Sequence, residues 1–428
     1  MNMFGLKEAE VAELVRTVAG SDLDRSEIEE RFARAAWSGI SEPGDGVAGE
    51  VVAMLGAPTA LTAVIDRWTP EVFLDRLRST NIMADDIEKA LARWMPRLES
   101  GPTIVALRQA ARFGARLRVP SDESWPTSLD DLGHFAPLAL WTRGTEHALE
   151  TFHRSISLVG ARAATGYGEH VTMEAAAGLV DRGYAIVSGA AYGIDGMAHR
   201  AALASHGMTV AFLAGGVDRF YPSGHDALLG RIVDHGMVIS ELPCGSQPTR
   251  WRFLQRNRLI AAASLATIVI EAGWRSGSLN TAHHALSLSR PVGAVPGPVT
   301  SAASDGCHKL IRESLVTCVT SADEMAELAP LSGQSRMPAE QPAEQPVDAR
   351  DDTDSASSNP TTARVVDALS ARSPREAGDI ATRSGLSIGD VRAELGRMLL
   401  DGAVREAERG WTKRAEPAQK PRQSRASG

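Results

Sequence analysis

The stretch from Phe253 to Ala285, FLQRNRLIAAASLATIVIEAGWRSGSLNTAHHA, decides the fold. It begins with the pattern of a helix whose first turn is basic, at residues 256–258, and continues as a bare apolar strand at 267–270 that ends in Glu271. A Gly/Ser turn at 276–278 then opens another helix. Backbone N–H groups at a helix N-terminus are unpaired, and the helix dipole favours negative charge there. The order strand, turn and helix therefore predicts an edge that binds anionic groups such as phosphates.

Around this stretch, from residue 155 onward, short apolar runs alternate with amphipathic segments. The runs are SISLVG, YAIVSG, MTVAFLAG, GMVISEL, ATIVIEA, PVGAVPG and LVTCV. Apolar strands joined by helices are typical of a parallel sheet covered on both faces. Residues 151–330 are therefore predicted to form an extended Rossmann-like domain, an α/β fold with a doubly wound, mostly parallel sheet. Its ligands are expected at the carboxyl ends of the strands.

Five further segments complete the predicted domain organisation. Residues 1–115 have apolar positions at helical spacing and predict a helical domain of the SAM or helix-hairpin-helix type. Residues 116–150 read as a connector with short extended pieces, and 331–360, with PAEQPAEQP and an acidic run, as a disordered linker. Residues 361–412 show three helical patterns and a hairpin, the outline of a winged helix. Residues 413–428 are a basic tail.

Composition indicates a cytoplasmic protein. The 428 residues include three cysteines without a C-x-x-C pair, which favours a reducing setting over a disulfide framework or a zinc site. The start, MNMFGLKEAEVAELV, lacks the apolar core of a secretory signal, and no stretch approaches the roughly 20 apolar residues of a membrane helix. The net charge of −8 argues mildly against broad coating of nucleic acid but leaves room for a local basic groove.

Nucleotide-binding motifs fit the strand ends poorly. The loop after the first strand reads GARAATGYG, which is not the G-x-G-x-x-G of dinucleotide sites, and the chain contains no G-x-x-x-x-G-K-[ST]. Neither NAD nor ATP is expected, and we predict no cofactor and no metal.

Two sets of titratable residues have alternative interpretations. Asp195 and His199 stand four apart and share a helix face, as a proton relay or, preferably, in structural hydrogen bonds. Glu241 and Glu271 each end a strand. They could perform acid–base chemistry, although we favour binding to loop N–H groups or to an arginine.

Arginines accumulate together with aromatic residues in the loops that follow the strands. This combination suits single-stranded nucleic acid, whose bases stack on rings while its phosphates are neutralised. The alternative for each ring is a place in the core or an interface. The arginines are Arg162, Arg219, Arg250, Arg252, Arg256, Arg258 and Arg275, with the rings of Phe220, Tyr221, Trp251, Phe253 and Trp274.

At these residues the chain resembles the DNA-processing protein A (DprA, also Smf) family. The matching pieces, in family order, are VGARAATGYG, SGAAYGIDGMAHRAAL, TVAFLAGGVDRFYPSGHDALL, ISELPCG, FLQRNRLIAA, IVIEAGWRSGSLNTAHHA and AVPGPVTSAASDGCHKLI. The resemblance implies a non-catalytic single-stranded DNA-binding protein of natural transformation and recombination. Such proteins protect incoming strands, dimerise through the Rossmann-like domain and load RecA recombinase.

Loop composition and the resemblance together predict twelve DNA-binding residues. They are Arg162, Thr165, Ser188, Gly189, Arg219, Arg252, Arg256, Asn257, Arg258, Gly277, Ser278 and Lys309.

Two other functions remain open. The same type of sheet occurs in nucleotide phosphoribohydrolases, which carry P-G-G-x-G-T-x-x-E where this chain reads EAGWRSGSLN. The winged helix could instead read duplex DNA. However, its last helix, at residues 388–400, has only Arg392 and Arg397 as basic residues beside acidic ones, so a protein-interaction role is favoured.

Overall fold

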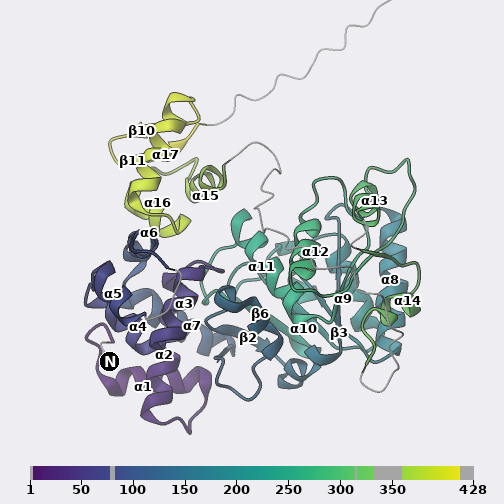
Figure 1. The fold of residues 1–428 in the computed structure, drawn as a ribbon, viewed down its shortest axis with the longest axis horizontal. Coiled ribbons are helices and arrows are strands. Elements are labelled where there is room, and N and C mark those ends of the chain that lie inside the picture. The colour runs from purple at the N-terminus through teal and green to yellow at the C-terminus, as the bar shows by residue number, and fades with distance from the viewer. Residues whose placement is uncertain (1–2, 78–81, 314–315, 332–358, 415–428) are drawn as a thin grey trace, which may run out of the picture. The chain divides into compact units, whose positions relative to one another are not determined.

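The computed structural model describes residues 3–77, 82–313, 316–331 and 359–414 (Figure 1). The chain divides into two compact units. The larger comprises residues 1–91 and 97–356, and the smaller contains residues 92–96 and the C-terminal domain from 357 onward. The predicted linker and basic tail fall almost entirely outside the described residues.

The larger unit is built on a nine-stranded sheet in the order β1-β2-β6-β5-β4-β3-β7-β8-β9. Strands β3 to β9 pair in parallel, whereas β2 pairs antiparallel with both β1 and β6. The predicted doubly wound, mostly parallel fold is confirmed. The strands are β1 (Arg116–Arg118), β2 (Leu140–Gly144), β3 (Ser155–Val159), β4 (Ala185–Ser188), β5 (Thr209–Phe212), β6 (Met237–Ser240), β7 (Ala266–Val269), β8 (Val292–Ala294) and β9 (Thr317–Cys318).

Every residue of β3 to β8 is buried, because helices cover both faces of this sheet. One apolar cluster includes side chains of α8, α9 and α14, and another includes those of α11, α12 and α13. Chain order reverses direction between β3 and β7, so their carboxyl ends form the topological switch point. The helices are α8 (Gly166–Asp181), α9 (Ile194–Ala204), α10 (Asp226–His235), α11 (Arg250–Ala263), α12 (Gly277–Ser287), α13 (Asp305–Arg312) and α14 (Ala322–Glu327).

Strands β1 and β2 lie in the segment that the sequence interpretation treated as a connector. They extend the sheet beyond β6. Trp141 of β2 is fully buried, and its indole Nε1 donates to the hydroxyl of Ser38 at 3.2 Å. Sequence periodicity identified these short extended pieces but could not show their pairing, because the partner β6 is almost 100 residues further along the chain.

The N-terminal segment is helical, as predicted, and packs onto the sheet within the same unit. One apolar cluster contains Val11, Phe32 and Leu107 of its helices together with Trp141 and Val238 of the sheet. The helices are α1 (Glu8–Ala19), α2 (Arg25–Ile40), α3 (Gly46–Leu55), α4 (Ala57–Ile65), α5 (Pro70–Arg76), α6 (Ala84–Trp94) and α7 (Ser100–Phe113).

Short 3-10 helices occupy several connections: η1 (Met95–Arg97), η2 (Thr127–Phe135), η3 (Glu146–Arg154) and η4 (Ser223–His225). Within the described residues, no single helix is long and apolar enough to cross a membrane. Helices α3 and α4 reach that length and apolarity only as a pair, which is bent by 112°.

The C-terminal domain is a winged helix, as predicted. It consists of α15 (Pro360–Ala368), α16 (Ala377–Ser384), α17 (Ile388–Leu400) and the hairpin of β10 (Val404–Ala407) and β11 (Gly410–Lys413) (Figure 1). Its core is its own, with Val365, Ile380 and Leu395 completely buried. In α17, Arg397 donates to Glu394 at 2.6 Å and to Asp401 at 3.1 Å, so much of its charge is neutralised within the helix.

Candidate nucleic-acid interface

The switch-point edge is formed by the loops that follow β3, β4, β5 and β7. The carboxylate of Glu271, directly beyond β7, ties two of these loops together. It accepts hydrogen bonds from the backbone N–H of Thr165 at 2.9 Å and from the Thr165 hydroxyl at 2.6 Å. The Thr165 hydroxyl in turn accepts from the N–H of Gly168 and caps α8. Glu271 therefore has the structural role that we favoured, because its charge is used to fix the loop after β3.

Arg256 of α11 lies beneath the loop after β4. It is only 5% exposed, and its Nη1 donates to the carbonyl of Phe212 at 2.7 Å. A Cβ atom at Gly189 would lie 1.9 Å from that Nη1, so the loop requires glycine for this close approach. Burial lowers the pKa of Arg256 to about 10, which still leaves the guanidinium charged at neutral pH. Its Nε has no partner among the described groups.

Asp195 and His199 do not form a proton relay with one another. Asp195 accepts a long hydrogen bond, 3.4 Å, from the N–H of Ala191, and burial raises its pKa. The Nδ1 of His199 is hydrogen-bonded to the hydroxyl of Thr209 at 2.7 Å. Burial lowers the pKa of His199 to about 3, so its ring is neutral at pH 7. Both residues hold the loop and sheet in place, which was the preferred interpretation.

Other predicted site residues on α11 are engaged within the protein. Arg258, 3% exposed, donates to both carboxylate oxygens of Glu241, at 2.7 and 2.8 Å, in a bidentate pair. Arg252 forms a similar pair with Glu42, at 2.7 and 3.1 Å. The side-chain amide of Asn257 donates to the carbonyl of Gly277 at 3.2 Å. The structure begins α11 at Arg250, so residues 256–258 lie beyond the first turn predicted for them. These contacts anchor α11 and leave little of Arg252, Asn257 and Arg258 facing solvent.

Besides Gly189, the predicted set contains three small residues, Ser188, Gly277 and Ser278. Ser188 is fully buried and donates to the carbonyl of Leu158 at 2.7 Å. Ser278 is 8% exposed and shares a hydrogen bond with the hydroxyl of Ser276 at 2.8 Å. Gly277 is exposed and forms the first residue of α12.

The exposed cations of the set lie at the rim of the same loops. Arg162 is exposed, and its guanidinium lies 5.0 Å from the ring centroid of Phe253. That ring is 5.6 Å from the ring of Tyr221. Arg219 is exposed two residues before Tyr221. In the described part of the chain, neither arginine has a carboxylate partner. The structure therefore brings Arg162, Phe253 and Tyr221 together from segments far apart in sequence.

Exposed aromatic rings follow four strands of the edge. They are Tyr167 after β3, Tyr192 after β4, Tyr221 after β5 and Trp274 after β7, and their exposed fractions are 39%, 48%, 51% and 55%. The ammonium group of Lys309 lies 5.5 Å from the Trp274 ring centroid. None of these rings is among the twelve predicted residues, although Tyr221 and Trp274 belong to the rings that accompany the arginines in the sequence. For Tyr167 and Tyr192, the signal was a tyrosine adjoining a glycine in a strand-end loop.

The described residues contain no group of three or more His, Cys, Asp and Glu side chains that could hold a metal ion. The polar atoms of the edge are instead backbone N–H groups, guanidinium groups and rings, which suit a charged polymer with exposed bases.

Comparison with known proteins identifies the family of this chain. A family model described as "DNA recombination-mediator protein A" matches residues 116–330, and one described as "DprA winged helix domain" matches residues 338–408. A putative DNA processing protein DprA of Mycobacterium tuberculosis is 51% identical over 234 residues, which is 52% of this chain and 60% of that protein. The match thus spans less than two thirds of that relative.

Two further comparisons extend over more of the relatives' lengths. Protein Smf of Escherichia coli is 34% identical over 60% of this chain and 74% of its own. The X-ray structure of DNA processing protein A from Streptococcus pneumoniae superposes with a TM-score of 0.56 at 28% identity, covering 72% of this chain and 99% of that one. The family that the sequence motifs indicated is confirmed.

Replacing Glu241 with Gln is expected to destabilise the fold by about 3–5 kcal/mol, because Arg258 is left as a buried, poorly compensated charge. The free energy of unfolding from urea denaturation measures the loss. Glu327→Gln, at an exposed carboxylate of α14, is the control and should change stability by less than about 0.5 kcal/mol. A double variant, Glu241→Gln with Arg258→Met, should recover part of the loss. Equal stability of Glu241→Gln and the wild type would contradict a structural pair.

Proposed function

We propose that this chain, which belongs to the DNA recombination-mediator protein A family, binds single-stranded DNA along its switch-point edge. The observation that carries the proposal is the cluster of Arg162, Phe253 and Tyr221, in which an exposed guanidinium lies beside exposed and half-buried rings. Guanidinium groups neutralise phosphates, and rings stack on unpaired bases without sequence preference. Duplex DNA offers the phosphates but keeps its bases stacked, so the combination favours single strands.

Within the predicted set, we assign direct DNA contact to the residues that reach solvent. These are Arg162, Arg219, Lys309 and Gly277, with half-buried Thr165 at the base of its loop. Arg252, Arg256, Asn257 and Arg258 are assigned the task of shaping the edge, together with Ser188, Gly189 and Ser278. Arg256 additionally supplies a buried positive charge beneath the Gly189 loop, which attracts a phosphate even without touching it.

We further propose that the protein acts without catalysis. The carboxylates that could perform acid–base chemistry are bound to protein groups: Glu271 to Thr165 and Glu241 to Arg258. No observation on the described residues favours the alternative, a nucleotide phosphoribohydrolase. We place the activity in the cytoplasm, in DNA processing during transformation and recombination, with protection of single strands as its role.

RecA loading and homodimerisation through the Rossmann-like domain are part of the proposal, and the family resemblance supports them. Sedimentation of the full chain should give twice the monomer mass. RecA should form filaments faster on strands that this protein has coated than on strands coated by a single-strand-binding protein alone. A monomer at micromolar concentration would contradict the dimer. Unchanged filament growth would contradict the recombinase role and leave DNA binding standing.

Arg162→Ala should weaken binding to oligothymidine by about 5- to 30-fold, the equivalent of one charge-assisted contact of roughly 1–2 kcal/mol. The slope of log affinity against log salt should become shallower by about 0.7, the value for one phosphate on a single strand. Fluorescence anisotropy across a salt series measures both. Arg116→Ala is the matched control, since that exposed arginine starts β1, five strands from β3 in the sheet. Equal losses in the two variants would show that the edge is misplaced.

Trp274→Leu should also weaken binding, but with a different signature. Loss of one stacked base is worth roughly 1–3 kcal/mol, or about 5- to 150-fold in affinity. The salt slope should stay unchanged, because no charge is removed. Leucine keeps apolar bulk at this exposed position, so the fold should be unaffected. Wild-type affinity in this variant would exclude Trp274 from base stacking.

A further inference from the structure

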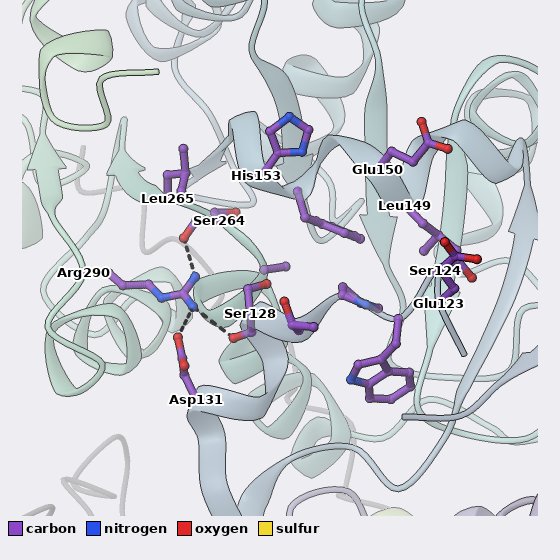
Figure 2. Close-up of a pocket in the computed structure, with 15 residues that line it drawn as sticks. Glu123, Ser124, Ser128, Asp131, Leu149, Glu150, His153, Ser264, Leu265 and Arg290 are labelled. Atoms are coloured by element: carbon purple, nitrogen blue, oxygen red, sulfur yellow. Dashed lines mark hydrogen bonds and ion pairs between the residues drawn. The ribbon is translucent and has the colours of Figure 1, made fainter. Parts of the chain in front are cut away.

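A pocket lies at the other end of the strands, beside the amino ends of β3 and β7. Figure 2 shows the residues that line it. Its volume is about 540 Å³. Two of its walls, residues 149–153 and 263–265, come just before these strands, and a third wall is formed by residues 123–131. Since β3 has five residues at about 3.3 Å each, the pocket is roughly 16 Å from the switch-point edge. It is therefore separate from the proposed DNA site.

Arg290 is held tightly in this pocket by protein acceptors. Its Nη1 donates to the carbonyls of Ala261 and Ser264, at 3.2 and 2.6 Å. Its Nη2 donates to the carbonyl of Ser128 at 3.0 Å and to the Asp131 carboxylate at 2.8 Å, and Figure 2 shows the guanidinium pointing at these groups. The side chain is 13% exposed. Because its Nη donors are used and its charge is paired with Asp131, Arg290 offers little to an anionic ligand.

The groups that remain open are oxygen acceptors. Glu123 is exposed and forms no ion pair with a described residue. Among the described residues, Glu150 accepts a hydrogen bond only from the His147 ring, at 2.7 Å, and its side chain is 69% exposed. The Ser128 hydroxyl also has no hydrogen-bond partner among the described groups, but it is buried and out of reach of a ligand in the pocket.

The rest of the lining is apolar. Trp125, Leu149 and Phe152 are each 5% exposed and pack into the core that supports the pocket. The indole N–H of Trp125 donates to Asp130 at 2.9 Å, so the ring offers its apolar surface rather than its polar edge. Carboxylates beside apolar walls match a ligand with a cationic end and a hydrocarbon body.

We propose that this pocket binds an organic cation, namely a primary ammonium or guanidinium group on an aliphatic stem. The cationic N–H groups would donate to Glu123 and Glu150, while the stem covers the apolar wall. Two sources carry this chemistry: a free polyamine, or a lysine or arginine side chain of a peptide. DNA phosphates are repelled by the same carboxylates, so the site is selective for a ligand other than DNA.

Calorimetric titration of the full chain tests the site at physiological ionic strength, about 0.15 M. The probes are spermidine and the peptide acetyl-Leu-Lys-Arg-amide, with acetyl-Leu-Glu-Glu-amide and butanediol as charge-reversed and uncharged controls. At least one cationic probe should bind saturably with one-to-one stoichiometry. Glu123→Gln and Glu150→Gln should each lower its affinity about 2- to 5-fold, as expected for a solvent-exposed ion pair. Glu327→Gln, which removes a carboxylate elsewhere, should leave it unchanged.

The outcomes separate the two sources. Binding of spermidine alone assigns the pocket to a free polyamine, and binding of the peptide alone assigns it to a basic side chain. Absence of saturable binding by either, equal binding of a control probe, or equal affinity in both glutamine variants and the wild type overturns the proposal. Oligothymidine affinity, measured on the same variants, should equal that of the wild type, so failure here is distinguishable from failure of the DNA-binding proposal.

Discussion

The bond between the Glu271 carboxylate and Thr165 joins the two halves of the doubly wound sheet where their strands diverge. Glu271 follows β7 and Thr165 opens α8 after β3, so one buried carboxylate fixes both sides of the switch point. The direction in which Arg162 and Tyr167 leave the loop depends on this bond, because both lie within three residues of Thr165. An ion or nucleotide could have filled such a crevice in other folds of this type. Here the Glu271 side chain fills the crevice, and the surface left for ligands is the exposed outer side of the loops.

Much of the architecture could be predicted from the sequence because it rests on local patterns. Fully apolar runs identified the seven parallel strands, and the helix–helix–helix–hairpin order identified the winged helix. The pairing of β2 with β6 could not be inferred, since register across a long separation leaves no periodic signal. The same limit applies to the core shared between the N-terminal helices and β2.

The sequence predicted which loops form the candidate site, but not which of their residues face solvent. An arginine reads identically in sequence whether it faces solvent, as Arg162 does in its loop, or a buried carboxylate, as Arg258 does in α11. Only the partner Glu241, at the end of a different strand, makes the distinction. The exposure of rings such as Tyr192 could not be predicted for a related reason, because burial of an aromatic residue is set by tertiary packing.

The close approach of Gly189 and Arg256 also constrains how relatives of this chain can diverge. A methyl group at position 189 would occupy the space of the guanidinium, and a shorter residue at position 256 would leave a void beneath the loop and the Phe212 carbonyl without its donor. Either single replacement is therefore costly while the other position keeps its residue. The two positions, far apart in the chain, are therefore expected to be substituted together in evolution or not at all. A relative that has lost the arginine would no longer require glycine at position 189.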